Sequence, residues 1–188
     1  EDPELQQHFV EVWRHIAERY RDEEAVIGYD LINEPVPGVM TTDGTFEHKQ
    51  LFPLYSRTIK AIREVDPHTM VILEPPGYGV VYPVFIEKLP FKNLVYSPHV
   101  YVPHTYDKDG NLIWVGGKTE TPSQIKQTYN SIKNDAADMD APLLIGEFGY
   151  PEKIIPKTPG ALGAEQWLIT NYSLQDSLFV GSLLWDYY

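Results

Sequence analysis

Apolar residues recur along this chain in two periods, one typical of helices and one typical of strands. Residues 3–22 carry apolar side chains at helical spacing, with Glu and Arg on the other side, so an amphipathic helix is predicted there. Asp2 is the expected N-cap and Pro3 the expected first-turn residue. The apolar positions of this helix are Leu5, Phe9, Val12, Ile16 and Tyr20.

The next segment, residues 25–32, is a mostly apolar run typical of a strand buried on both faces. It ends at Asn33-Glu34-Pro35, where proline cannot continue a hydrogen-bonded ladder. Thr121 and Gln124 form a predicted capping box at the start of a later helix. The same alternation continues to residue 188, with helices predicted near 47–65, 80–88, 121–138 and 163–177, and strands near 70–73, 93–101, 143–148 and 180–188.

Strict alternation of helix and strand predicts an α/β fold with a parallel sheet. No repeat, low-complexity tract or linker interrupts residues 1–188, so we expect a single unit. Five predicted strands fit either an open doubly wound sheet or part of an eight-stranded barrel. No glycine-rich phosphate loop follows any strand, which leaves the nucleotide-binding form of the open sheet without support.

Composition narrows the classes of partner. A formal net charge of −12 argues against nucleic acid and anionic membrane surfaces, which attract Lys/Arg clusters. Thirteen tyrosines and four tryptophans fit a packed core as well as a site where aromatic faces stack on sugar rings. No cysteine is present, so disulfides and Cys-based zinc sites are excluded. The histidines lack metalloprotease spacing, and we expect neither metal nor cofactor.

Polar residues interrupt the apolar strands mainly where each strand ends. In parallel α/β folds the active site lies at the edge of the sheet formed by the C-terminal ends of the strands. Several polar residues at that edge therefore indicate a functional site more strongly than any one of them alone. Strict alternation also places Leu143, Ile145 and Glu147 on one face of their strand. The residues at the strand ends are Asn33, Glu34, Glu74, His99, Tyr101, Glu147, Trp185 and Asp186.

Two of these carboxylates suggest acetal hydrolysis. A retaining glycosidase needs two carboxyl groups about 5–5.5 Å apart, one as acid/base and one as nucleophile. In an open sheet, three strand spacings would separate the strands of Glu34 and Glu147 by about 14 Å. A closed barrel points both side chains across a common mouth, so this chemistry favours the barrel.

The motifs Asn33-Glu34-Pro35 and Gly146-Glu147-Phe148-Gly149 resemble the signatures of glycoside hydrolase family five, the cellulase A family. This resemblance implies a (β/α)8 TIM barrel, of which the chain covers about strands four to eight, the C-terminal part of the catalytic domain. It implies Glu34 as general acid/base and Glu147 as nucleophile.

The same resemblance implies roles for the residues around the two carboxylates. Asn33 is expected to hold the substrate 2-hydroxyl, and Tyr101 to donate its hydroxyl to the nucleophile. His99 is expected to line the cleft and Trp185 to form the floor of a sugar subsite. We place Glu74 with the substrate-binding residues because of its position at a strand end.

Finer motifs leave the substrate open. Residues 27–35 and 72–76 resemble the endoglycoceramidase branch most closely, but endo-β-glucanases share most of these motifs. Residues 102–120, with Tyr106 and Trp114, form a predicted loop that we expect to select the substrate. An oligosaccharide, polysaccharide or glycolipid substrate and an extracellular location are expected.

The family pattern also contains an Arg and a His on early strands. No residue of this chain corresponds to them. The competing hypothesis is therefore a catalytically incomplete barrel fragment, or a carbohydrate-binding remnant, that needs the missing N-terminal barrel segment. A fragment of this kind would leave two sheet edges open.

Overall fold

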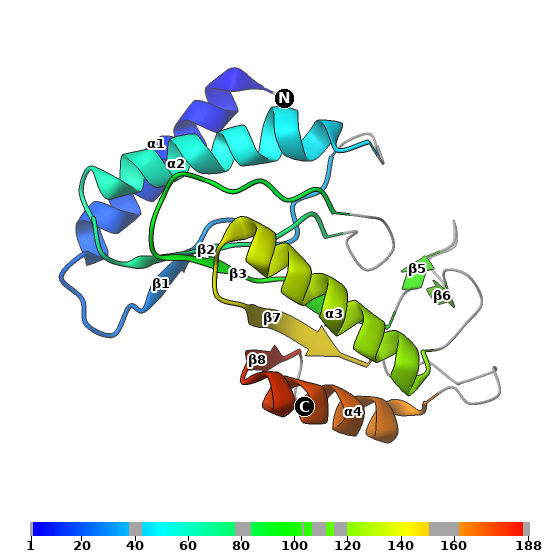
Figure 1. Ribbon diagram of the computed structural model, residues 1–188. Helices are drawn as coiled ribbons and strands as arrows, with labels where there is room; N and C mark the ends of the chain where they lie inside the picture. Colours follow the sequence, from blue (N-terminus) through cyan, green and yellow to red (C-terminus); the bar gives the residue numbers. More distant parts are fainter. Residues whose placement is uncertain are drawn as a thin grey trace.

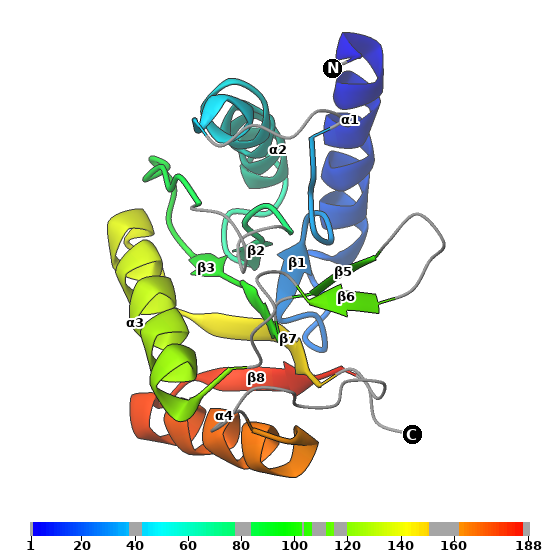
Figure 2. The same cartoon turned by 90° about the vertical axis from the view of Figure 1, so that its right-hand side faces the viewer.

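The computed structural model describes residues 2–37, 43–77, 84–102, 104–106, 112–114, 120–150 and 162–185. Its central feature is a set of parallel strands with helices α1, α2, α3 and α4 arranged around one side of them (Figures 1 and 2). None of the described helices is long and apolar enough to cross a membrane.

The parallel strands follow one another in chain order. β1 (Gly28–Asp30) pairs with β2 (Met70–Leu73), and β2 pairs with β3 (Leu94–Tyr96). A second sheet joins β4 (His99–Tyr101), β7 (Leu144–Gly149) and β8 (Gly181–Leu184) in the same way. A doubly wound sheet reverses its strand order at a switch point, whereas this order never reverses, as in an arc of a barrel.

The two sheets are linked through a break in one predicted strand. Residues 93–101 form β3 and β4 instead of a single strand, because Pro98 has no backbone N–H to donate. Bonding nevertheless continues through the break, since Ser97 N donates to the Leu73 carbonyl at 2.9 Å and Gly146 N donates to the Pro98 carbonyl at 3.1 Å. The arc therefore runs from β1 to β8 through one locally bent strand.

Helices α1, α3 and α4 begin at or next to the residues that the sequence predicts. α1 (Pro3–Tyr20) is capped by the Asp2 side chain, which accepts from the backbone N–H groups of Glu4 and Leu5. α3 (Pro122–Met139) starts with the predicted capping box of Thr121 and Gln124. α4 (Ala164–Leu178) also lies close to its predicted range.

Two predicted elements differ from the structure. The predicted helix over 47–65 is a π-helical turn, η1 (Glu47–Leu51), that continues as α2 (Phe52–Arg63), with Pro53 at the start of α2. The predicted helix near 80–88 is wrong over residues 84–88, which have no regular structure, and residues 80–83 lie outside the described residues.

The predicted loop at 102–120 contains a small antiparallel hairpin. Strand β5 (His104–Tyr106) pairs with β6 (Leu112–Trp114), so the prediction of a loop is wrong over these two strands. Residues 108–111, whose Lys-Asp-Gly-Asn sequence predicts a turn, lie outside the described residues, as do the side chains of Tyr106 and Trp114.

The core lies between the strands and the helical layer, and α1 packs on α2 as α3 packs on α4. At the two ends of the arc, Ile27 beside β1 and Leu183 in β8 remain exposed. Fully buried members of the core include Ile59, Ile62, Val71, Leu73, Ile125, Tyr129, Ile145, Phe148 and Trp167.

Asp66 ties this core to the turn before β2. Its buried carboxylate accepts from the Tyr29 hydroxyl at 2.8 Å and from the backbone N–H groups of His68 and Thr69 at 3.0 Å each. Burial opposes ionisation, but the hydrogen bonds from Thr69, His68 and Tyr29 outweigh it and lower the pKa of Asp66 to about 2.

Replacing Asp66 with alanine should lower the free energy of unfolding by about 2–3 kcal/mol at pH 7, because three donors lose a charged acceptor. The contribution of a carboxyl with a lowered pKa is full above its unfolded value, about 3.9, and disappears as the pH falls through about 2. Denaturant unfolding should therefore show the difference between variant and wild type shrinking between pH 4 and pH 2. Asp22→Ala, at an exposed carboxylate, is the control, and an equal loss in both variants would contradict the account.

Candidate active site

Glu34 lies in the loop after β1 and has an unusual backbone conformation. Its φ of 43° is left-handed, which is costly for a residue with a Cβ. The backbone N–H of Glu34 donates to Glu74 Oε2 at 2.7 Å. Gly77 approaches so closely that a Cβ there would lie 2.8 Å from the Glu34 Cβ, so this neighbour must be glycine. The surroundings thus fix the position from which the Glu34 side chain projects.

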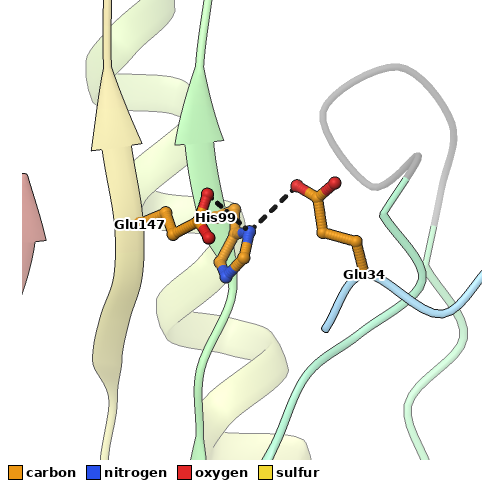
Figure 3. A group of neighbouring side chains, drawn as sticks. All are labelled: Glu34, His99 and Glu147. Atoms are coloured by element: carbon orange, nitrogen blue, oxygen red, sulfur yellow. Dashed lines mark hydrogen bonds and ion pairs between the residues drawn. The ribbon is translucent and has the colours of Figure 1, made fainter. Parts of the chain in front are cut away.

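His99, on β4, contacts three carboxylates. Its Nδ1 lies 2.9 Å from Glu34 Oε1 and 3.4 Å from Glu147 Oε2, and its Nε2 lies 3.3 Å from Glu74 Oε1. Figure 3 shows the ring between Glu34 and Glu147. Burial disfavours the charged ring, but the hydrogen bonds to Glu34 and Glu74 and the charges of Glu74 and Glu147 outweigh it and raise the pKa of His99 to about 10. The ring is therefore an imidazolium at neutral pH.

Glu147 lies on β7 beside His99, its partner in the parallel ladder. The Tyr101 hydroxyl donates to Glu147 Oε2 at 2.5 Å. A hydrogen bond to an ionised oxygen favours the charged form of a carboxyl group. Tyr101 and His99 thus give Glu147 the surroundings of an anion.

A β-bulge in β7 turns Glu147 toward the site. Ile145 pairs with Ser182 and Phe148 with Leu184, so β7 has one extra residue between these pairs. A Cβ on Gly146 would meet Ser97 Oγ at 2.4 Å and His99 Nε2 at 3.1 Å, while the Glu147 carboxylate also reaches His99. Two consecutive residues therefore face His99, and the expected strict alternation along this strand is wrong.

The two catalytic candidates come together across the arc. One carboxylate oxygen of Glu34 and one of Glu147 lie within 4.8 Å of each other and of a ring nitrogen of His99. This spacing is far below the 14 Å or so expected for an open sheet and fits a retaining pair. The side chain of Glu34 is 41% exposed and that of Glu147 is 20% exposed.

The same three side chains have the spacing of a metal site, since their donor atoms lie within 4.8 Å of one another. A metal would require a neutral ring nitrogen on His99. Both ring nitrogens face carboxylates, however, and the raised pKa keeps the ring protonated. The arrangement favours a proton at His99 over a metal ion.

The remaining predicted residues occupy different surroundings. Asn33 is exposed directly before Glu34. Trp185 follows β8. Its backbone N–H donates to the Phe148 carbonyl at 2.9 Å, and the residue is 60% exposed. Glu74 has a side chain that is only 5% exposed, which leaves it little surface to offer a sugar.

A family comparison agrees with this geometry. The model of the family described as "Cellulase (glycosyl hydrolase family 5)" matches residues 2–187. The chain belongs to glycosyl hydrolase family 5. The resemblance seen in the two glutamate motifs is thereby confirmed.

Curated relatives of this family 5 chain include two kinds of enzyme. It is 32% identical to an endoglycoceramidase of Cyanea nozakii over 114 residues, which are 53% of this chain and 22% of that protein. It is 24% identical to endoglucanase H of Acetivibrio thermocellus over 144 residues, 76% of this chain and 15% of that protein. The chain thus matches about a fifth or less of the length of these relatives.

Solved structures identify the architecture. Endo-glycoceramidase II from Rhodococcus sp., solved as a lactosyl-enzyme intermediate, matches with a TM-score of 0.72 and 27% identity over 98% of this chain and 40% of that one. The cellulose synthase subunit Z of Clostridioides difficile matches with a TM-score of 0.72 and 20% identity over 100% of this chain and 62% of that one. This family 5 chain therefore folds as part of a (β/α)8 barrel, as predicted.

Sequence reasoning missed Asp30, at the end of β1. The residue is exposed on its strand. Partial desolvation, the charge of Glu74 and a hydrogen bond to that side chain nevertheless raise its pKa to about 7, with a smaller contribution from Glu147 and against the charge of His99. The signal was an acidic residue inside an otherwise apolar strand, where an unpaired carboxylate would be costly.

Replacing Gly146 with alanine should destabilise the protein by about 1–3 kcal/mol, because the new methyl group would overlap the buried Ser97 Oγ. Ser97→Ala alone should cost little, since that oxygen has no hydrogen-bond partner in the described part of the chain. The double variant Ser97→Ala/Gly146→Ala should then recover most of the loss in denaturant unfolding. Simple addition of the two single effects would show that the contact is not the cause.

The His99 ring should stay protonated across neutral pH. Because its pKa is raised, the stability that this group contributes is fully present below about pH 6.5 and disappears as the pH rises through about 10. In NMR spectra assigned with a His99→Asn variant, its ring signals should hold their positions from about pH 5 to 8. A titration midpoint near 6.5 would contradict the ion-pair geometry.

Proposed function

We propose that this chain carries the catalytic carboxylates of a retaining endo-β-glycosidase that works by double displacement. The observation that carries the proposal is the approach of the Glu34 and Glu147 carboxyl groups, with oxygens within 4.8 Å, at the C-terminal end of the parallel strands. Inverting enzymes separate their carboxyls by about 6.5–9.5 Å to make room for a water molecule.

Glu147 is the proposed nucleophile. Its side chain accepts a hydrogen bond from the Tyr101 hydroxyl and lies 3.4 Å from His99 Nδ1, so both partners orient the carboxyl group in the site. Attack on the anomeric carbon forms a bond from that carbon to Glu147 and breaks the bond to the leaving oxygen. A lactosyl-enzyme intermediate is the form in which the similar endo-glycoceramidase II from Rhodococcus sp. was solved, and this supports the proposal.

Glu34 is the proposed general acid/base. It donates its proton to the leaving oxygen in the first step. In the second step it removes a proton from the water that attacks the anomeric carbon, while the bond from that carbon to Glu147 breaks and releases the Glu147 carboxylate. Its side chain is the more exposed of the two, which suits a group that meets both leaving group and water.

Asn33 and Trp185 are proposed to bind the sugar, while His99, whose side chain is 8% exposed, is proposed to line the site. Asn33 is exposed beside Glu34, where it can reach the 2-hydroxyl. His99 lines the site between the two carboxylates, and the exposed Trp185 is the proposed floor for a pyranose face.

We propose a glycosphingolipid as the substrate. Support comes from the endoglycoceramidase of Cyanea nozakii, at 32% identity, and from the match to endo-glycoceramidase II over 98% of the chain. A β-glucan is the second candidate, because endoglucanase H of Acetivibrio thermocellus matches over 76% of the chain. An extracellular location suits either substrate and is part of the proposal.

Glu147→Gly should abolish hydrolysis of an aryl β-glycoside by the full-length protein, and Glu34→Ala should reduce it by about 100- to 10,000-fold for a poor leaving group. The exposed Glu11→Ala serves as a matched control and should keep wild-type rates. Unchanged rates in Glu147→Gly would refute the assignment. A wild-type protein that binds sugar but never turns over would favour the catalytically incomplete alternative.

The substrate class is tested with two assays on the same preparation. Release of ceramide from a ganglioside is the expected result, with little release of reducing ends from carboxymethylcellulose. The reverse pattern would identify a β-glucanase and remove the glycolipid proposal.

A further inference from the structure

Glu74 is a buried carboxylate whose two oxygens are both engaged by the catalytic machinery. It follows β2, and its side chain is 5% exposed. Oε2 accepts from the Glu34 backbone N–H at 2.7 Å, and Oε1 lies 3.3 Å from His99 Nε2. The Tyr55 hydroxyl also donates to the Glu74 carbonyl at 2.8 Å, which fixes the main chain. One side chain therefore links the acid/base loop to the central imidazolium.

The contact with Glu34 acts on a strained point of the backbone. Glu34 has φ of 43°, a conformation that persists only where the surroundings impose it. A carboxylate acceptor on this N–H makes the stronger kind of hydrogen bond, so it can help to impose the left-handed conformation. Loss of the acceptor frees the Glu34 backbone to relax and moves its carboxyl group.

The contact with His99 orients the ring. Nε2 faces Glu74, so Nδ1 points at Glu34 and Glu147. Without Glu74, the ring loses one of the three carboxyl groups that contact it, and the only one at Nε2 among the described residues. The Glu34–Glu147 spacing thus depends on Glu74 through two routes, the backbone of Glu34 and the ring of His99.

Asp30 completes the surroundings of Glu74. Its side chain hydrogen-bonds to Glu74, and a hydrogen bond between two carboxyl groups requires a proton on one of them. The charged groups that act on Asp30 are Glu74, Glu147 and His99. The net effect raises the pKa of Asp30 to about 7, so Asp30 carries the shared proton below about pH 7 and loses it as the pH rises above that value.

We propose that Glu74 is a positioning residue for the reaction, one that places the general acid/base Glu34 and orients His99 without touching the substrate. This inference rests on the proposed function. It replaces the sequence-based expectation that Glu74 binds substrate, because its buried oxygens already have protein partners.

The test compares the full-length Glu74→Ala and Glu74→Gln proteins on aryl β-glycosides with good and poor leaving groups. Only a poor leaving group needs the proton from Glu34, so misplacing Glu34 should cost about 100-fold in kcat/KM for a phenyl-type leaving group and within about threefold for dinitrophenol. Gln keeps one oxygen for the Glu34 N–H, and should recover part of the loss with KM near the wild-type value.

Glu120→Gln is the matched control. Glu120 is another buried glutamate, but it accepts from the Trp167 indole N–H at 2.8 Å, away from the catalytic residues. Its replacement should lower thermal stability without changing the dependence on leaving group. If the Glu74 variants lose the same factor on every leaving group, as a purely structural defect would, or lose nothing, the positioning role is wrong. Glu74→Gln carries the test if Glu74→Ala fails to fold.

Two further variants separate this inference from the proposed function and examine Asp30. Glu34→Ala should show the same dependence on the leaving group more strongly, and if it does not, the proposed function itself fails.

Asp30→Asn retains a donor to Glu74 but cannot ionise, so it should keep activity at pH 6 and extend the active pH range on the alkaline side. Loss of activity at pH 6 equal to that of Asp30→Ala would overturn the role given to Asp30.

Discussion

The contact of one imidazolium with three carboxylates organises this site. His99 reaches Glu34 in the loop after β1, Glu74 after β2 and Glu147 on β7, so three separate segments of the arc converge on a single ring. Three carboxylates this close would repel one another without a cation between them. The cation is held inside by ion pairs and hydrogen bonds, which offset the cost of its burial.

The fold supplies what this contact requires. Parallel strands in chain order bring the C-terminal ends of β1, β2, β4 and β7 to one edge, and the bend at Pro98 lets one predicted strand serve both sheets. The bulge in β7 then directs Glu147 to the same side as Gly146. The bend at Pro98 and the bulge in β7 therefore both lie next to the site, where they change the direction in which side chains point.

Much of the architecture was predictable from the sequence. Caps at Asp2 and Thr121 predicted where two helices begin, and β2 lies on its predicted residues, because these signals are local. The pairing of Glu34 with Glu147 followed from barrel closure and from the family motifs. The contacts of Glu74 and Asp30 were not predictable, since they depend on which side chains meet after the strands assemble. The bulge and the hairpin β5–β6 were missed because neither has a clear periodic signal.

The central claim is that Glu147 forms the bond to the sugar while Glu34 transfers protons. It is tested most directly by incubating the full-length protein with a 2-deoxy-2-fluoro glycoside that has a good leaving group, then locating the bound sugar by peptide mass spectrometry. The account predicts a glycosyl ester on Glu147. A label on Glu34, or continued turnover with inversion at the anomeric carbon and no label, would contradict it.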